Sequence, residues 1–144
     1  MDQNYINKTI GMLTIRLLLG FIFLMQGWGK VFSWGVDNIY NNGFKPYAEY
    51  LPEFLLKVAA YYTSYTELIG GALLILGLFR NYALYALALV LVVVTFGHGL
   101  SEPIWDLQHV MYRAILLAPL LLLPVEWDKW KLDTLIFKAK EEKK

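Results

Sequence analysis

The chain has 144 residues, of which 58% are hydrophobic and 17% are charged, and its formal net charge is +1. Soluble domains have roughly 45–50% apolar and about 25% charged residues, so this composition disfavours a soluble globule and favours lipid as the solvent. The near-neutral charge gives no basic surface for nucleic acid. The absence of cysteine excludes disulfides, thiolate metal sites and thiol redox chemistry within the chain.

Four apolar segments are each long enough to cross a bilayer as a helix, which takes roughly 20 residues. Backbone groups in lipid must be satisfied internally, so each segment is predicted to be helical. In chain order the predicted spans are about 10–34, 52–78, 81–99 and 103–123. The predicted fold is all-α: a polytopic membrane protein with a single domain over residues 1–144, built as a four-transmembrane-helix bundle.

The placement of positive charge predicts the orientation of the bundle, because Lys and Arg gather in cytoplasmic segments. Lys8 and Arg16 lie near the N-terminus, Arg80 follows the second span, and the segment 124–144 is rich in lysine. Both termini are therefore predicted to be cytoplasmic, with 124–144 forming an amphipathic tail on the inner leaflet. Arg16 is expected to snorkel to the inner interface, and Arg80 is most simply interpreted as a determinant of the orientation. The aromatic loop 35–51 is predicted to pack onto the outer mouth of the bundle.

Polar residues within the spans fall on shared helix faces. The first span carries one stripe of residues spaced three or four apart: Arg16, Gly20, Phe23, Gly27 and Lys30. The glycines of this stripe would allow another helix to approach closely. On the second span Glu67 shares a face with Gly70 and Gly71. Ionisable groups in a membrane are costly and mark function by default, and those expected at one level in the outer half are Lys30, Glu67, His98, His109 and Arg113.

This convergence predicts a polar pocket that opens outward and could hold a quinone head group. Quinone carbonyls need hydrogen-bond donors such as lysine, arginine or histidine, and their reduction needs a proton carrier. Glu67 and His98 are predicted as the catalytic residues. The predicted cofactor-binding residues are Lys30, His109, Arg113, Trp28 and Tyr65.

Other functions stay open beside this interpretation. Buried charge pairs also fix helix register without chemistry, so a non-catalytic membrane assembly or accessory protein is an alternative. A small-molecule transporter component is a second alternative, disfavoured because a single four-helix chain lacks the inverted repeats of many transporters. Two histidines without further ligands are a weak signal, so no metal site is predicted and haem is not expected.

Two stretches resemble the DoxX family of membrane proteins. The run RLLLGFIFLMQGWGK at 16–30 looks like the opening helix of that family, and ELIGGALLILGLFRNYA at 67–83 looks like its second signature. His98 also fits, and the resemblance covers about residues 10–124. It implies a four-helix bundle in the bacterial or archaeal cytoplasmic (inner) membrane. The family includes membrane subunits of a thiosulfate:quinone oxidoreductase, which implies a redox role.

The chain lacks two features that this reaction would need. It has no cysteine to handle sulfur covalently and no large soluble domain to bind thiosulfate. In such a reaction this chain would supply a quinone site, and a soluble or membrane redox partner would supply the rest. A homo-oligomer is also plausible, because Gly20, Gly27 and the 83–88 face allow close helix contacts.

Overall fold

The computed structural model of the protein describes residues 2–101, 107–134 and 136. In these ranges the chain is helical and contains no strand, which confirms the predicted all-α class. Short π-helical segments (η1, η2) and 3-10 segments (η3, η4) accompany the longer helices. The elements are α1 (Gln3–Trp28), η1 (Gly29–Ser33), α2 (Val36–Ile39), η2 (Tyr40–Phe44), η3 (Lys45–Glu49), α3 (Glu53–Leu76), α4 (Arg80–Ser101), α5 (Gln108–Leu122) and η4 (Val125–Trp127).

The long helices overlap the four predicted spans, with shifted ends. α1 begins at Gln3 rather than near residue 10, because Asp2 caps its first turn by accepting a hydrogen bond from the backbone N–H of Asn4. The beginning of the predicted fourth span lies outside the described residues. Among the described helices, Gln3–Ser33 and Arg80–Ser101 are long and apolar enough to cross a membrane, and α5 is a shorter apolar helix.

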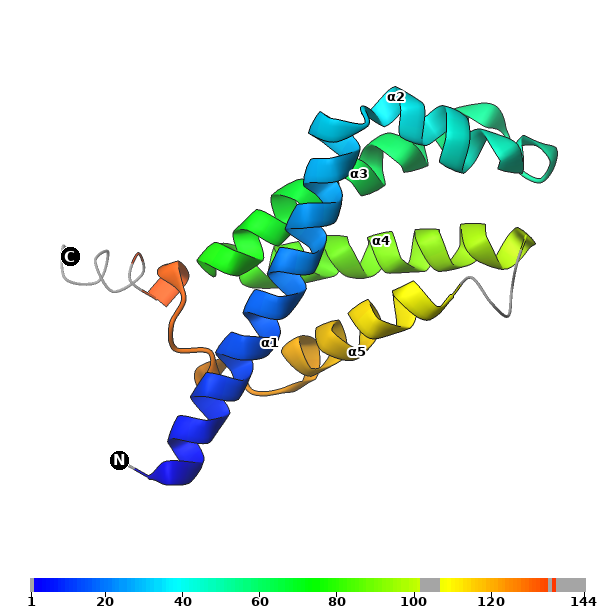
Figure 1. Ribbon diagram of the computed structural model, residues 1–144. Helices are drawn as coiled ribbons and strands as arrows, with labels where there is room; N and C mark the ends of the chain where they lie inside the picture. The colour runs from blue at the N-terminus through cyan, green and yellow to red at the C-terminus, as the bar shows by residue number, and fades with distance from the viewer. Residues whose placement is uncertain (1, 102–106, 135, 137–144) are drawn as a thin grey trace.

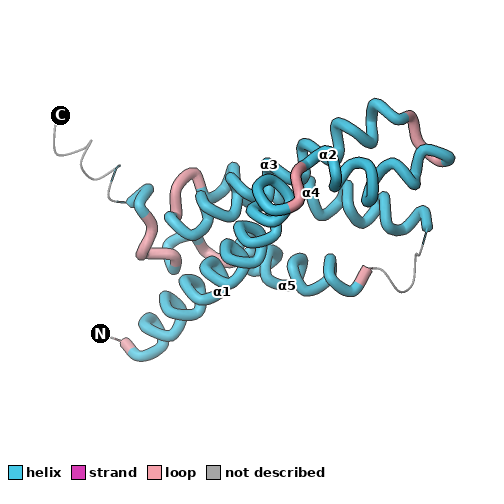
Figure 2. Tube along the Cα trace, turned by 45° about the horizontal axis from the view of Figure 1, so that its top comes forward, coloured by secondary structure: helices cyan, strands magenta, loops and turns pink. Residues whose placement is uncertain are grey.

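The long helices form a bundle in which α1 and α4 each pack against α3 and α5 (Figures 1 and 2). The most extensive contact joins α1 to α3. A Cβ atom at Gly27 would collide with the backbone of Leu68, and one at Gly71 with the backbone of Leu24. The two backbones therefore touch, which confirms that the predicted glycine stripe allows close approach of another helix.

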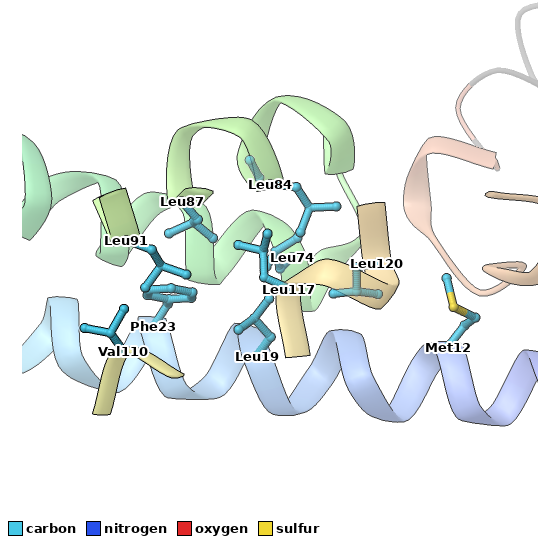
Figure 3. Packing of buried hydrophobic residues seen from close by; sticks show 11 residues of the cluster. Met12, Leu19, Phe23, Leu74, Leu84, Leu87, Leu91, Val110, Leu117 and Leu120 are labelled. Carbon is cyan, nitrogen blue, oxygen red and sulfur yellow. The ribbon is translucent and has the colours of Figure 1, made fainter. Parts of the chain in front are cut away.

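Leucine side chains from all four long helices fill the middle of the bundle. Leu19, Leu74, Leu87 and Leu120 are fully buried there, together with Phe23 (Figure 3). At the level of Gly70 and Gly71 the interior is closed, since the side chain of Leu87 would lie 3.0–3.2 Å from a Cβ at Gly70. This packing separates the two ends of the bundle, each of which carries buried charge.

The end of the bundle that holds the start of α1 contains a buried cluster of three charges. Arg16 Nε donates to Asp128 Oδ1 at 3.1 Å, and Arg80 Nε lies 2.9 Å from Asp128 Oδ2. All three side chains are buried. Arg16 therefore does not snorkel, so that expectation is wrong, whereas Arg80 has a structural contact in addition to its predicted role in orientation. Both guanidinium groups form ion pairs with the carboxylate of Asp128, which belongs to the C-terminal segment.

The segment 124–134 folds back onto this end of the bundle (Figure 1). Asp133 accepts hydrogen bonds from the backbone N–H groups of Phe79 and Arg80, at 3.2 and 3.5 Å, and so caps the start of α4. Trp127 packs against the core, whereas Trp130 stays exposed. These residues are therefore docked on protein, while most of the remaining predicted tail lies outside the described residues.

At the other end, the segment from η2 to Leu51 covers the start of α3. Tyr40, Leu56 and Ala60 are buried together, and Phe44 and Tyr47 pack against them. The prediction that the aromatic loop 35–51 packs onto one mouth of the bundle is confirmed in its contacts. The loop thereby forms the roof of the cavity described below.

A hydrogen bond from Tyr40 Oη to Glu53 Oε1, 2.6 Å long, ties this roof to α3. It raises the pKa of Tyr40 from 10.0 to about 12. Because the folded value lies above the ordinary one, the contribution of this contact to folding is complete below pH 10.0 and is lost as the pH rises through about 12. We expect a tyrosinate absorbance step near pH 12 that is absent from Tyr40→Phe. A difference titration centred on the ordinary tyrosine value would contradict this assignment.

Candidate functional site

A cavity of about 660 Å³ lies under this roof, among the last turns of α1 and α4, the first half of α3 and the start of α5. Its volume falls within the roughly 300–1,000 Å³ of pockets that bind small molecules. Its walls are mainly apolar and aromatic. Its polar side chains include Gln26, Lys30, Glu67, His98, His109 and Arg113.

Two cations converge on one carboxylate at the floor of the cavity. Lys30 Nζ lies 2.6 Å from Glu67 Oε2, and Arg113 Nη1 lies 3.5 Å from Glu67 Oε1. The side chain of Glu67 is fully buried and that of Arg113 nearly so. A carboxylate this deep is tolerated because the cations compensate its charge. One positive charge of the cluster is left in excess, which favours an occupant with electron-rich oxygens.

Ion pairs, and not regular hydrogen bonds, hold the carboxylate of Glu67 in place. Within the described residues, neither of its oxygens accepts a hydrogen bond of good geometry, although Lys30 is close. Arg113 directs its donors elsewhere: Nη1 donates to Gln26 Oε1 at 2.8 Å, and Nε to the backbone oxygen of His109 at 3.0 Å. The two ion pairs leave lone pairs of this carboxylate unused, so a hydroxyl donor in the cavity could hydrogen-bond to Glu67.

Lys30 connects the buried carboxylate with the exterior. It belongs to the π-helical segment η1, a turn type frequent at functional sites, and its side chain is 23% exposed. Its ammonium group pairs with Glu67, while part of the side chain stays accessible.

The two histidines lie together at the edge of the cavity. The ring centroids of His98 and His109 are 5.0 Å apart with an interplanar angle of 79°, and the ring of Tyr47 is 6.5 Å from that of His98. Tyr47 Oη in turn lies 3.2 Å from Ser101 Oγ. In the described part of the chain, no group of three or more His, Asp or Glu side chains is placed to hold a metal ion.

The structure brings five of the predicted site residues to one cavity: Lys30, Glu67, His98, His109 and Arg113. Trp28 and Tyr65 lie outside it, with exposed side chains that contact Phe32 and Tyr61. Their placement follows from helix geometry, because Trp28 is one residue from Gly27 and Tyr65 two residues from Glu67. Residues one or two apart do not share a helix face.

Other residues occupy the places predicted for Trp28 and Tyr65. Trp34, Phe44 and Tyr47 supply aromatic walls from the turn and roof that follow α1, and Gln26 orients Arg113. Gln26 was detectable from the sequence, since it stands four residues before Lys30 within the first apolar span. The aromatic residues of the roof were not detectable from the sequence, because helical periodicity does not indicate which helix a loop covers.

The comparisons with known proteins agree with the membrane character of the chain. The DoxX family model matches residues 11–99, more than half of the chain, a region that includes Lys30, Glu67 and His98. His109 and Arg113 complete the cavity from beyond the matched region. No curated protein and no solved structure matches the chain. The family match shows that this chain belongs to the DoxX family of membrane proteins.

Proposed function

We propose that the chain is an integral membrane subunit of a redox complex, and that its cavity holds a quinone head group. One observation carries this proposal: Glu67 is a fully buried carboxylate without a regular hydrogen bond, beside two cations, at the floor of a mainly apolar cavity of ligand size. Such a combination of an apolar pocket with a few convergent polar groups is typical of small-molecule sites.

The residues present fit both oxidation states of a quinone head. When bound, a quinone supplies two-electron, two-proton chemistry at its ring oxygens. Lys30 and Arg113 can donate hydrogen bonds to a carbonyl oxygen, and Glu67 can accept one from a hydroxyl group. Trp34 and Phe44 provide aromatic surface for the ring. We therefore assign binding of the head group to these residues.

Glu67 and His98 are proposed to hold and transfer protons, because both are ionisable groups that line the cavity. His109, which packs against His98, is proposed to contribute to binding. The proposed electron donor is a separate soluble or membrane partner. A homo-oligomer is a further proposal.

The proposed topology has four spans, with both termini on the cytoplasmic side of a bacterial or archaeal inner membrane. One feature supports it, and one consequence follows from it. Arg16 and Arg80 gather at the bundle end that holds the start of α1, as positively charged residues do at cytoplasmic ends. The cavity lies at the opposite end, so in this orientation it would be in the outer half of the membrane.

The test of the proposed function is the quinone content of the purified protein, measured by solvent extraction and mass spectrometry. Glu67→Gln removes the charge with little change of shape. Glu67 accepts from a hydroxyl group of the reduced head, and hydrogen bonds to charged groups are worth about 1.5–3 kcal/mol, so affinity for the quinol should fall roughly 10- to 100-fold. Glu49→Gln makes the same change on an exposed residue of the roof and should leave affinity unchanged. Absence of quinone from the wild-type protein, or equal quinol affinity of the wild-type protein and Glu67→Gln, would overturn the proposal.

A non-catalytic assembly or accessory protein is the second candidate. The cluster of Arg16, Arg80 and Asp128 favours it, because there the same chain uses two cations and one carboxylate to join segments. Under this alternative Glu67→Asp would lower the yield of a complex without changing quinone binding. A transporter component ranks below both, since the interior is packed at the level of Gly70 and Gly71.

A further inference from the structure

The margin of the cavity carries large apolar side chains that are also exposed. Met25 on α1 and Phe96 on α4 line the cavity, yet 70% and 59% of their surfaces are accessible. A residue that borders both a cavity and the exterior lies at its mouth. In a mouth that opened to water, polar side chains would be favoured at these places.

Both residues belong to longer exposed apolar rows. The row on α1 and the following η1 consists of Leu18, Phe21, Met25, Trp28 and Phe32, and that on α4 of Tyr85, Leu89, Val92 and Phe96. The members of each row are three or four residues apart, so each row is one continuous helix face. These two helices are the ones long and apolar enough to cross a membrane. The rows are therefore the faces expected to contact lipid tails, and the cavity reaches each row at one residue.

We propose that the cavity takes its occupant from the bilayer, as an amphiphile with an oxygen-bearing head and an apolar tail. The head lies at Lys30, Glu67 and Arg113, and the tail passes Met25 or Phe96 into the lipid. The excess positive charge at Lys30, Glu67 and Arg113 and the apolar margin together favour this class. A quinone with an isoprenoid tail and a fatty acid carboxylate both belong to it. The inference rests on the proposed function only in taking this cavity as a ligand site.

The proposal is tested by photolabelling of the whole protein in phosphatidylcholine vesicles. One probe is a benzoquinone whose alkyl tail carries a diazirine, and the other is a fatty acid with a diazirine at the same distance from its head. Mass spectrometry locates the labelled residues. Leu18 and Leu89 are the internal references, because they stand in the same rows with 51% and 52% exposure but do not line the cavity.

We expect labelling of Met25, Phe96 or both to exceed that of Leu18 and Leu89 several-fold. An excess of an unlabelled decyl-substituted benzoquinone should suppress it at Met25 and Phe96 and not at the references. Equal labelling along the rows would show ordinary lipid exposure and overturn the proposal. Labelling concentrated on Gly43 and Tyr47 would also overturn it, because the tail would then leave through the roof.

The two probes separate this inference from the proposed function. Site-specific labelling by the quinone probe supports both. Site-specific labelling by the fatty acid alone supports a bilayer-derived amphiphile and overturns the quinone role. A benzoquinone without a tail that competes as well as the decyl compound would overturn the tail assignment while leaving the quinone role standing.

Discussion

Replacement of Asp128 by alanine is expected to lower the free energy of unfolding by about 3–5 kcal/mol, the cost typical of removing one partner from a buried ion pair. Asp128 is the shared counter-ion of Arg16 and Arg80, and all three side chains are buried. Without it, two guanidinium groups remain in the interior. Backbone carbonyls still hold them, since Arg16 also donates to Leu74 and Trp130 and Arg80 to Leu120.

The measurement is helix content by circular dichroism during titration of the detergent-solubilised protein with dodecyl sulfate. Glu126→Ala is the matched control, because Glu126 is an exposed carboxylate two residues away in the same segment. Asp128→Asn keeps the shape of the side chain and isolates the loss of charge. An unfolding midpoint for Asp128→Ala equal to that of Glu126→Ala would show that the C-terminal segment does not hold the bundle together.

Gly27→Ala is expected to be the second strongly destabilising change. A Cβ atom at this position would collide with the backbone of Leu68 and the carbonyl carbon of Glu67, and neither can move as a side chain could. Overpacked sites usually cost about 1–3 kcal/mol, and a clash of backbone with backbone belongs at the upper end of that range. Separation of α1 from α3 would also displace Glu67 from Lys30, so quinone binding should be lost together with stability.

Gly11→Ala is the control, since nothing lies within 4 Å of a Cβ atom added there on the same helix. Alanine is favoured over glycine within a helix by roughly 0.5–1 kcal/mol, so this variant should be slightly stabilised. The two glycine variants are thus expected to move the unfolding midpoint in opposite directions. A stabilised Gly27→Ala would contradict the close packing of α1 on α3.

Features that lie within a single helix were the ones best predicted from the sequence. Spacing of three and four residues identified the face of α1 that holds Gly20, Phe23 and Gly27, and all three are buried as that stripe predicts. The same reasoning placed Glu67 on the buried face of α3. Depth within an apolar segment then indicated which charged side chains meet, because helices of similar length align their ends in a bilayer.

Contacts between distant segments were not predictable in this way. Arg16 and Asp128 are 112 residues apart, and no sequence pattern in either segment indicates that these two side chains form a contact. We predicted that the C-terminal segment lies on the membrane surface, because its tryptophans and lysines suit a membrane interface as well as they suit docking on the protein. Burial of Asp128 follows from where η4 and the residues after it pass over the ends of α1 and α4. That path depends on the tertiary structure as a whole.

The two charged clusters have a joint consequence for ion permeability. Each contains two cations and one carboxylate, and they lie at opposite ends of a closely packed interior. A hydronium or metal ion moving through the bundle would meet net positive charge both on entering and on leaving. Because Coulomb repulsion is strong in a low-dielectric interior, this arrangement would disfavour the passage of a cation from one end of the bundle to the other.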